Sequence, residues 1–275
     1  MKSVEWKWKS RDGLEMYAHG WAPESPKAVV VLVHGFGEHV NRYAHVAAAL
    51  AEAGYALQGF DLRGHGQSGG QRGHTPSYEN LLEDIADFIA EVRQRFPGLP
   101  VFIYGHSMGG NLVSNYVLRF PEKLKGAIVT SPWLKLAFDP PAAQVVLAKV
   151  LNRLAPGLTL ASTLDVAFLS RDAEVVRKYV ADPLVHSKIS VRLYSSIYAS
   201  GLWALEHAAE LKIPMFLAHG TGDKITSAPA SQEFAQKAGK LVTLRLWEGF
   251  FHETHNEPEQ AAVLKALTGW LDGQL

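Results

Sequence analysis

A serine flanked by glycines at the end of an apolar run is the residue of this 275-residue chain best placed for chemistry. The run VFIYGHS (101–107) leads into MGGNLV, so Ser107 stands between Gly105 and Gly109 where a predicted strand becomes a predicted helix. So sharp a turn crowds the positions two residues away, which favours glycine there, and exposes the hydroxyl near a helix N-terminus. Such a serine can attack a carbonyl carbon if a base accepts its proton. The alternative is a glycine-rich helix start whose serine only packs against the loop.

A histidine must supply that base, and a carboxylate must orient it. In a strand–helix fold with this turn, the order along the chain is serine, acid, histidine. Asp223 in AHGTGDKIT follows an apolar strand and is the favoured acid, with an ordinary turn as its alternative. His252 in EGFFHETHNEPE, between the last predicted strand and the last helix, is the favoured base, and His255 is the alternative. The other histidines after the serine are less favoured. His186 and His207 lie in a predicted insertion, and a structural role suits His219 at the end of a strand.

The oxyanion formed by such an attack needs two backbone N–H donors. One is expected from Met108, directly after the serine, and the other from Phe36 in the glycine-containing loop HGFGEH (34–39).

The elements that must position these residues alternate along the chain. Apolar β-branched runs at 28–35, 55–61, 101–107, 126–132 and 214–220, with a more alternating run at 241–249, predict strands of a parallel sheet. Amphipathic segments between them predict helices, one of them with Thr75 as N-cap and Pro76 at its first position. Two early runs, near 4–9 and 14–21, predict an antiparallel edge. We therefore expect an α/β fold with a mostly parallel, doubly wound sheet.

The alternation of predicted strands and helices stops between residues 133 and 210, where no comparable strand is found. We interpret 133–210, here called the cap, as a mainly helical insertion over the carboxyl edge of the sheet, where ligands bind in such folds. Residues 1–132 and 211–275 then form the two parts of the core. The helix predicted at 142–155 has a wide apolar face, and some of Val146, Val150, Leu151 and Leu154 are expected to line an acyl site.

Composition excludes several classes of function. Basic and acidic residues number 27 each, so there is no electrostatic argument for nucleic acid, and the absence of cysteine excludes disulfides and thiolate metal sites. The N-terminus lacks the apolar core of a secretory signal, and no apolar run is long enough to cross a bilayer. A soluble, cytoplasmic protein is expected, and the sequence does not indicate an oligomeric state.

Six segments resemble the monoacylglycerol lipase branch of the α/β-hydrolases: HGFGEHVNRY, DLRGHGQSGGQRGH, GLPVFIYGHSMGG, ADPLV, HGTGDKIT and EGFFHETHNEP. They follow the family's order over almost the whole chain. The resemblance implies an α/β-hydrolase fold with Ser107 as nucleophile, Asp223 as acid and His252 as base. It also implies Phe36 and Met108 as oxyanion donors and hydrolysis of monoacylglycerols and simple esters without a cofactor.

The resemblance also implies a polar pocket for the glycerol end of the substrate, formed by Glu38, Arg42, His106, Tyr179 and His255. A structural pairing of Glu38 with Arg42 is the alternative. Leu151 is the residue we expect in the acyl site. The expected partner is a small-molecule or lipid ester, with transient contact with a lipid interface and none with nucleic acid.

Two other functions fit the same fold. An iminopeptidase-like peptidase would need an acidic pocket for a free amine, for which Glu206 and Glu210 are the candidates. A ligand-binding protein without activity would need the pocket alone, but the presence of all three triad candidates argues against it.

Overall fold

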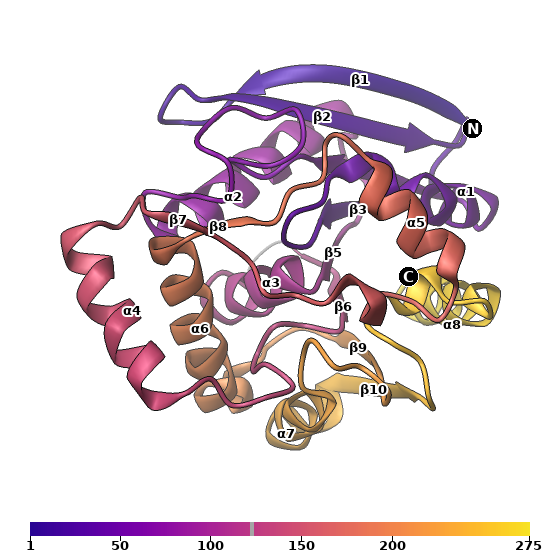
Figure 1. Ribbon diagram of the computed structural model, residues 1–275. Coiled ribbons are helices and arrows are strands. Elements are labelled where there is room, and N and C mark those ends of the chain that lie inside the picture. The colour runs from indigo at the N-terminus through magenta and orange to yellow at the C-terminus, as the bar shows by residue number, and fades with distance from the viewer. Residues whose placement is uncertain (122–123) are drawn as a thin grey trace.

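An eight-stranded sheet forms the centre of the computed structural model, which describes residues 1–121 and 124–275 (Figure 1). Its strand order is β1-β2-β4-β3-β5-β6-β9-β10. β1 pairs antiparallel with β2, and β2 with β4, whereas the remaining neighbours run parallel. The predicted mostly parallel sheet with an antiparallel edge is therefore confirmed. The strands are β1 (Lys2–Lys9), β2 (Glu15–Ala22), β3 (Ala28–Val33), β4 (Tyr55–Phe60), β5 (Val101–His106), β6 (Gly126–Thr130), β9 (Met215–Gly220) and β10 (Val242–Trp247).

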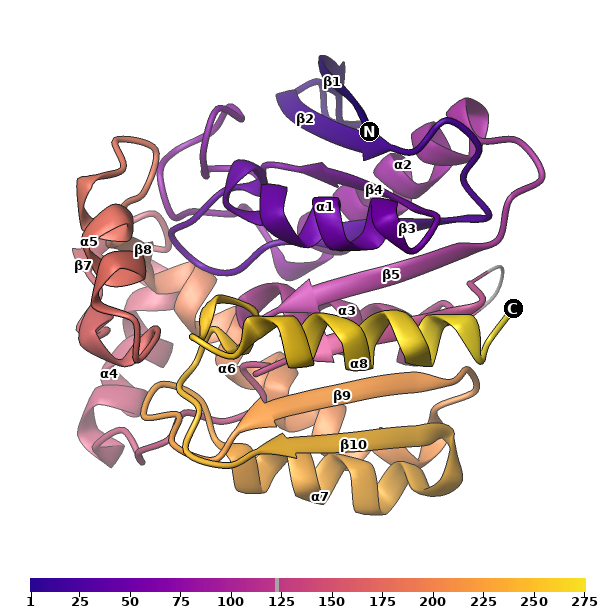
Figure 2. The ribbon, with the colours of Figure 1, turned by 90° about the vertical axis from the view of Figure 1, so that its right-hand side faces the viewer.

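Helices cover both faces of this sheet, as its doubly wound order requires. α1 (Ala44–Glu52) and α8 (Gln260–Asp272) pack on one face, where they lie in front of the strands in Figure 2. The other face is covered by α2 (Tyr78–Arg95), α3 (Met108–Arg119), α6 (Val191–Glu206) and α7 (Ala228–Ala238). Every residue of β3 to β6 and of β9 is buried, which accounts for their continuous apolar sequences.

The start of α2 differs from the prediction. Its N-cap is Ser77, whose Oγ accepts a hydrogen bond from the Asn80 N–H at 3.2 Å. The Thr75 hydroxyl instead donates to the Ser77 carbonyl at 2.6 Å, so it supports the turn before the helix. Pro76 therefore lies before the cap rather than at the first helical position.

Between β6 and α6 the chain builds a small layer at the end toward which the parallel strands point (Figure 2). It contains α4 (Ala142–Leu154), α5 (Ala173–Ala181) and an antiparallel pair of β7 (Thr159–Ala161) with β8 (Lys188–Ser190). α6 also lies within the predicted cap, but Leu193 and Ile197 are buried in the same cluster as Leu112 of α3. The boundaries 133–210 stay a prediction.

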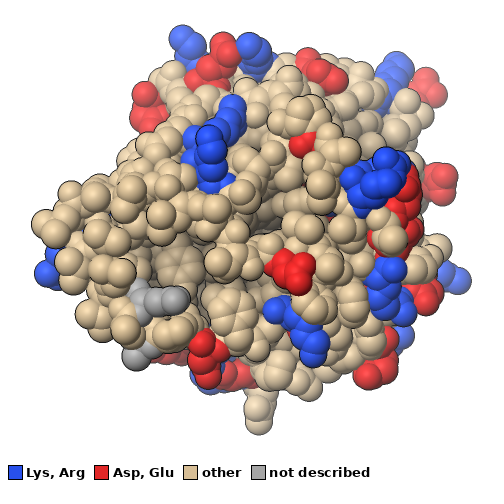
Figure 3. Space-filling model, viewed as in Figure 1, with Lys and Arg blue, Asp and Glu red and all other residues tan. Residues whose placement is uncertain are grey.

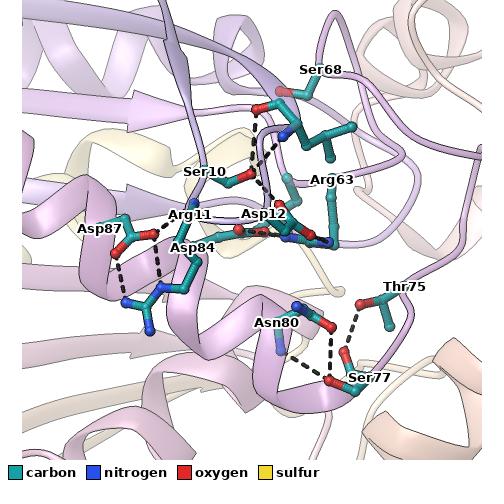
Figure 4. A network of polar contacts seen from close by, with 12 residues as sticks. Ser10, Arg11, Asp12, Arg63, Ser68, Thr75, Ser77, Asn80, Asp84 and Asp87 are labelled. Atoms are coloured by element: carbon teal, nitrogen blue, oxygen red, sulfur yellow. Dashed lines mark hydrogen bonds and ion pairs between the residues drawn. The ribbon is translucent and has the colours of Figure 1, made fainter.

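A buried ion-pair network fixes the glycine-rich loop that follows β4 (Figure 4). Arg63 donates to both oxygens of Asp84 in α2, at 2.6 and 2.7 Å, and to Asp12 at 2.9 Å. Arg63 and Asp84 are both buried, and breaking such a pair typically costs about 3–5 kcal/mol. The loop is thus bound to α2 and to the turn between β1 and β2.

The same loop holds the cap. The Ser190 N–H donates to the Gly73 carbonyl at 2.8 Å, and the Gln71 side chain donates to the Gly157 carbonyl at 2.7 Å. The His186 ring, through Nε2, lies 3.0 Å from the Gly64 carbonyl oxygen. The glycine-rich segment therefore has a structural role. None of the helices in the described part of the chain is long and apolar enough to cross a bilayer.

Candidate active site

Ser107 occupies the sharp turn between β5 and α3. Its backbone has φ 54° and ψ −116°, a strained conformation for a residue with a side chain. A Cβ atom on Gly105 would stand 2.3 Å from the Gly109 carbonyl oxygen, and one on Gly109 would stand 2.0 Å from that of Val33. Both glycines are therefore needed for the close approach of backbone to backbone that this turn requires.

The three triad candidates lie in one hydrogen-bonded row. His252 Nε2 is 2.8 Å from Ser107 Oγ, and His252 Nδ1 is 2.7 Å from Asp223 Oδ2. All three side chains are buried. Asp223 Oδ1 also accepts the backbone N–H groups of Ile225 and Thr226, at 2.7 and 3.0 Å.

Electrostatics in this row favour a charged acid and a basic imidazole. Burial disfavours the charged form of Asp223, but His252 and the hydrogen bonds from His219 and His252 outweigh it, and the pKa of Asp223 lies well below its usual range. Burial lowers the pKa of His252, but the Asp223 carboxylate outweighs this effect and raises the pKa above its usual value. The row can therefore remove a proton from the serine hydroxyl and hold it on the imidazole.

His255, the alternative base, packs against His106 and Tyr43 and has no hydrogen bond to the serine among those found in the described residues. Its ring is 4.8 Å from that of His106 and stacks on Tyr43 at 5.0 Å. Burial lowers the pKa of His255 to about 3, so its imidazole is neutral at ordinary pH. Its position favours His252 as the base.

The loop after β3 brings Phe36 to the serine. An added Cβ on Gly35 would stand 3.2 Å from Ser107 Cβ, so this loop passes directly beside the hydroxyl. The Gly35 N–H donates to Glu38 Oε1 at 2.6 Å, which holds the loop in place. Met108 begins α3 immediately after the serine. Phe36 and Met108 therefore lie beside the serine, and their role as oxyanion donors stays a prediction.

A buried charge cluster lies at the polar end of the site. Arg42 donates to Glu38 Oε2 at 2.6 Å and to both oxygens of Glu253 at 2.7 and 2.8 Å, and its guanidinium lies over the Tyr179 ring at 4.7 Å. Burial opposes ionisation of Glu253, but Arg42 outweighs it and lowers the pKa to about 2. Burial raises the pKa of Glu38. The structural pairing of Glu38 with Arg42 is thus present, and Glu253 is a third member that the sequence analysis missed. The sequence feature that could have indicated Glu253 is its carboxylate directly after the candidate base, His252.

A cavity of about 490 Å³ opens onto Ser107. Of the predicted polar pocket, Glu38, His106 and Tyr179 line it, whereas Arg42 and His255 are absent from the lining as far as residues 1–121 and 124–275 describe it. The remaining wall is mainly apolar and comes largely from the cap, including Trp133, Leu136, Phe138, Leu147, Leu151, Leu160, Phe168 and Tyr194.

Helix α4 borders this cavity with only part of its apolar face. Leu151 lines the cavity as predicted, together with Leu147 and Ala148. Val146 and Leu154 are 61% and 78% exposed, and Val150 is exposed as well, so of the four residues considered only Leu151 is found in the described lining. Over α4, on the left of Figure 3, nearly all side chains are uncharged.

A metal centre has no basis among the described residues, since no group of three histidine, aspartate or glutamate side chains there could hold an ion. His65 and the cap residue His186, whose ring centres lie 4.9 Å apart, both pack against Phe36.

Comparison with known proteins gives relatives over nearly the whole chain. Residues 24–259 match the family described as serine aminopeptidase, S33. The chain is 35% identical to a monoacylglycerol lipase of Mycolicibacterium smegmatis over 266 residues, covering 96% of this chain and 95% of that protein. It is 38% identical over 255 residues to an uncharacterized abhydrolase domain-containing protein of Dictyostelium discoideum, of which it spans 27%. The crystal structure of the Paleococcus ferrophilus monoacylglycerol lipase is 36% identical and superposes with a TM-score of 0.87, covering 94% of this chain and 99% of that one.

Proposed function

The chain belongs to the serine aminopeptidase S33 family of α/β-hydrolases, in its monoacylglycerol lipase branch, and from that premise we propose that it hydrolyses the ester bond of monoacylglycerols. It is a serine hydrolase of the carboxylic ester class, and its substrate is a small lipid ester. The observation that carries the proposal is the row from Ser107 Oγ to His252 Nε2 at 2.8 Å and from His252 Nδ1 to Asp223 at 2.7 Å, opening into an apolar cavity.

The reaction follows from this geometry in two steps. Ser107 Oγ attacks the ester carbonyl carbon as His252 Nε2 takes its proton, and the oxyanion accepts hydrogen bonds from the N–H groups of Phe36 and Met108. The imidazolium then donates its proton to the leaving alcohol, and the C–O bond breaks to leave an acyl-serine. Water, deprotonated by His252, attacks the acyl carbon. The imidazolium returns this proton to Ser107 Oγ as the bond between Oγ and the acyl carbon breaks, which releases the fatty acid and restores the serine. Asp223 stays ionised throughout and stabilises the imidazolium.

The composition of the cavity wall supports the choice of substrate. Most of the wall is apolar, and each methylene buried there contributes about 0.8 kcal/mol. The wall also presents the side chains of Glu38, His106, Tyr179 and Glu253, which offer hydrogen-bond partners for a polyol. One acyl chain and one small hydroxylated alcohol match these two kinds of lining.

A peptidase is the second candidate, because the family description names an aminopeptidase. The acidic residues that we considered for binding a free amine, Glu206 and Glu210, are exposed and lie at the end of α6 and in the turn after it. Glu253 lines the cavity, but Arg42 already neutralises it. These placements favour the ester over an amine-bearing peptide.

Hydrolysis of a monoacylglycerol should be compared with that of amino-acid p-nitroanilides under identical conditions. We expect turnover of the monoacylglycerol and of p-nitrophenyl esters, covalent labelling of Ser107 by a fluorophosphonate, and loss of both in S107A. Preferential cleavage of the anilides would assign the peptidase function. Labelling without turnover of any ester would contradict the proposal.

Helix α4 borders the cavity through Leu147 and Leu151, and its outer side exposes Val146, Val150 and Leu154, which supports transient contact with a lipid interface during substrate uptake. The cytoplasmic location and the lack of contact with nucleic acid stay predictions from the sequence, as does the division of the chain into a core and a cap.

A further inference from the structure

A second histidine contacts the acid of the triad, and we propose that His219 is a positioning residue for ester hydrolysis that holds Asp223 in place for His252. The inference rests on the proposed function. The sequence suggested only a structural role for this residue at the end of β9. The geometry gives it a more specific task.

His219 and His252 meet at the same carboxylate oxygen. His219 Nε2 lies 3.1 Å from Asp223 Oδ2, and His252 Nδ1 lies 2.7 Å from it. On its other side, His219 Nδ1 is 2.8 Å from Ser231 Oγ in α7. The side chains of His219 and Ser231 are fully buried, as is the Asp223 side chain. The hydrogen-bonded row thus continues past the acid to a second histidine and a second serine.

The proton positions follow from the partners. Asp223 is ionised and can only accept, so His219 Nε2 must carry a proton. In the neutral imidazole Nδ1 then accepts, and the Ser231 hydroxyl is the donor that fixes this tautomer. The same Nε2 lies 3.3 Å from the Thr226 carbonyl oxygen, a second acceptor on the same side.

This contact matters because of how the carboxylate is otherwise held. Asp223 Oδ1 is bound by two backbone N–H groups, whereas Oδ2, which orients His252, is held by side chains. The Thr226 hydroxyl is 2.9 Å from Oδ2 but also 3.1 Å from the Ser131 carbonyl oxygen, and its single proton serves only one of them at a time. His219 Nε2 lies closer to Oδ2, at 3.1 Å, than to the Thr226 carbonyl oxygen, at 3.3 Å, and is therefore a second donor at this oxygen.

Loss of that donor has two consequences. Oδ2 becomes less constrained, so the imidazole of His252 is less well aligned with Ser107. The carboxylate charge is also shared with one donor fewer, which strengthens its interaction with protonated His252 and raises the pKa of that histidine. The other titratable groups around His252 are His106, with its ring 4.9 Å away, and the carboxylates Glu253 and Glu38, and all of them stay unchanged.

The test compares H219A, H219Q and S231A with the wild type, using p-nitrophenyl butyrate across a range of pH. Glutamine keeps a neutral N–H donor near the position of Nε2. For H219A we expect a fall in kcat of roughly tenfold with KM within twofold, and an acid limb of kcat/KM displaced to higher pH. H219Q should recover most of kcat and restore the acid limb, and S231A should lie between H219A and the wild type.

Equal losses in H219A and H219Q with an unmoved acid limb would mean that the residue only fills space, and would overturn the proposal. Wild-type kinetics in H219A would do the same. If H219A does not fold, as judged by circular dichroism, the acid limbs of S231A and H219Q are compared. A limb at higher pH in S231A than in H219Q supports the proposal, and coinciding limbs contradict it. A wild-type protein that cleaves no ester would instead contradict the proposed function.

Discussion

Gly37 lies at the contact between the loop that carries Phe36 and the cap, and its substitution by alanine separates the roles of these two segments. Its φ is 75°, and an added Cβ would stand 2.4 Å from the carbonyl oxygen of His186. Its own carbonyl accepts the His186 N–H at 2.9 Å. Because the clashing atom belongs to the backbone, no side-chain rotation relieves it, and either the loop or the cap must move.

The contacts of each segment indicate which one yields. Glu38 and Arg42 hold the loop through buried, charged hydrogen bonds, which are worth roughly 1.5–3 kcal/mol each. His186 itself is held by neutral hydrogen bonds to Gly37 and Gly64, worth about 0.5–1.5 kcal/mol each. We therefore expect the cap to shift while the loop of residues 34–39, here called the oxyanion loop, keeps its position.

The expected magnitude combines two terms. Left-handed backbone costs alanine roughly 1–2 kcal/mol. The lost hydrogen bond adds about 1 kcal/mol, for a total of roughly 2–3 kcal/mol. At roughly 2–4 °C per kcal/mol, Tm should fall by roughly 4–12 °C. Displacement of the cavity wall should raise KM for a long-chain monoacylglycerol about tenfold, a loss of about 1.4 kcal/mol in binding. The kcat/KM for p-nitrophenyl acetate, which does not reach the cap, should stay within threefold.

G98A is the matched control, because Gly98 has φ 80° and an added Cβ there would meet nothing within 4 Å. It should lose stability through backbone strain alone and keep both kinetic constants. A hundredfold loss of acetate turnover in G37A would mean that the oxyanion loop has moved, since removal of one oxyanion donor costs roughly 10²–10³ in kcat. Identical kinetics in G37A and G98A would refute the inference that this contact holds the cap.

Two further predictions follow from the site. The kcat/KM for esters should fall on the acid side as a single group titrates at or above the ordinary histidine pKa of about 6.5, because His252 must be neutral to accept the serine proton and its pKa is raised by Asp223. A midpoint near the value of about 3 that burial gives His255 would transfer the base to that residue. L151W should shorten the preferred acyl chain, because Leu151 lines the cavity, and should spare acetate and butyrate esters. V146W, on the exposed face of the same helix, is the control, and coinciding chain-length curves for L151W and the wild type would remove α4 from the acyl site.

The sequence predicted the strands well, because each central strand is buried on both faces and its apolar run has no other explanation. Local geometry was also predictable where one residue type is required, as at Gly105 and Gly109 around Ser107. The N-cap of α2 was not, since Thr75 and Ser77 flank the same proline and have similar cap preferences. Only the folded chain shows that the Thr75 hydroxyl is used by the Ser77 carbonyl.

Predictions for the pocket were weaker because they depend on contacts between distant segments. Arg42 and Glu253 are 211 positions apart, and nothing in either segment alone indicates that they pair. The apolar face of α4 suggested an acyl site, but only part of it borders the cavity, and part is exposed, as at Val146 and Leu154. Periodicity identifies the apolar side of a helix but not what lies against it.

The charge cluster of Glu38, Arg42 and Glu253 links two parts of the site that the reaction needs at a fixed separation. Glu38 holds the Gly35 N–H of the oxyanion loop, and Glu253 directly follows His252. Arg42 joins the two carboxylates through hydrogen bonds of 2.6 to 2.8 Å, and it does so without lining the cavity among the described residues. A guanidinium committed to both carboxylates has few donors left for an alcohol. Arg42 is therefore better explained as a support for the spacing between oxyanion donors and base than as a ligand for glycerol, and recognition of the alcohol is left to the side chains that face the cavity.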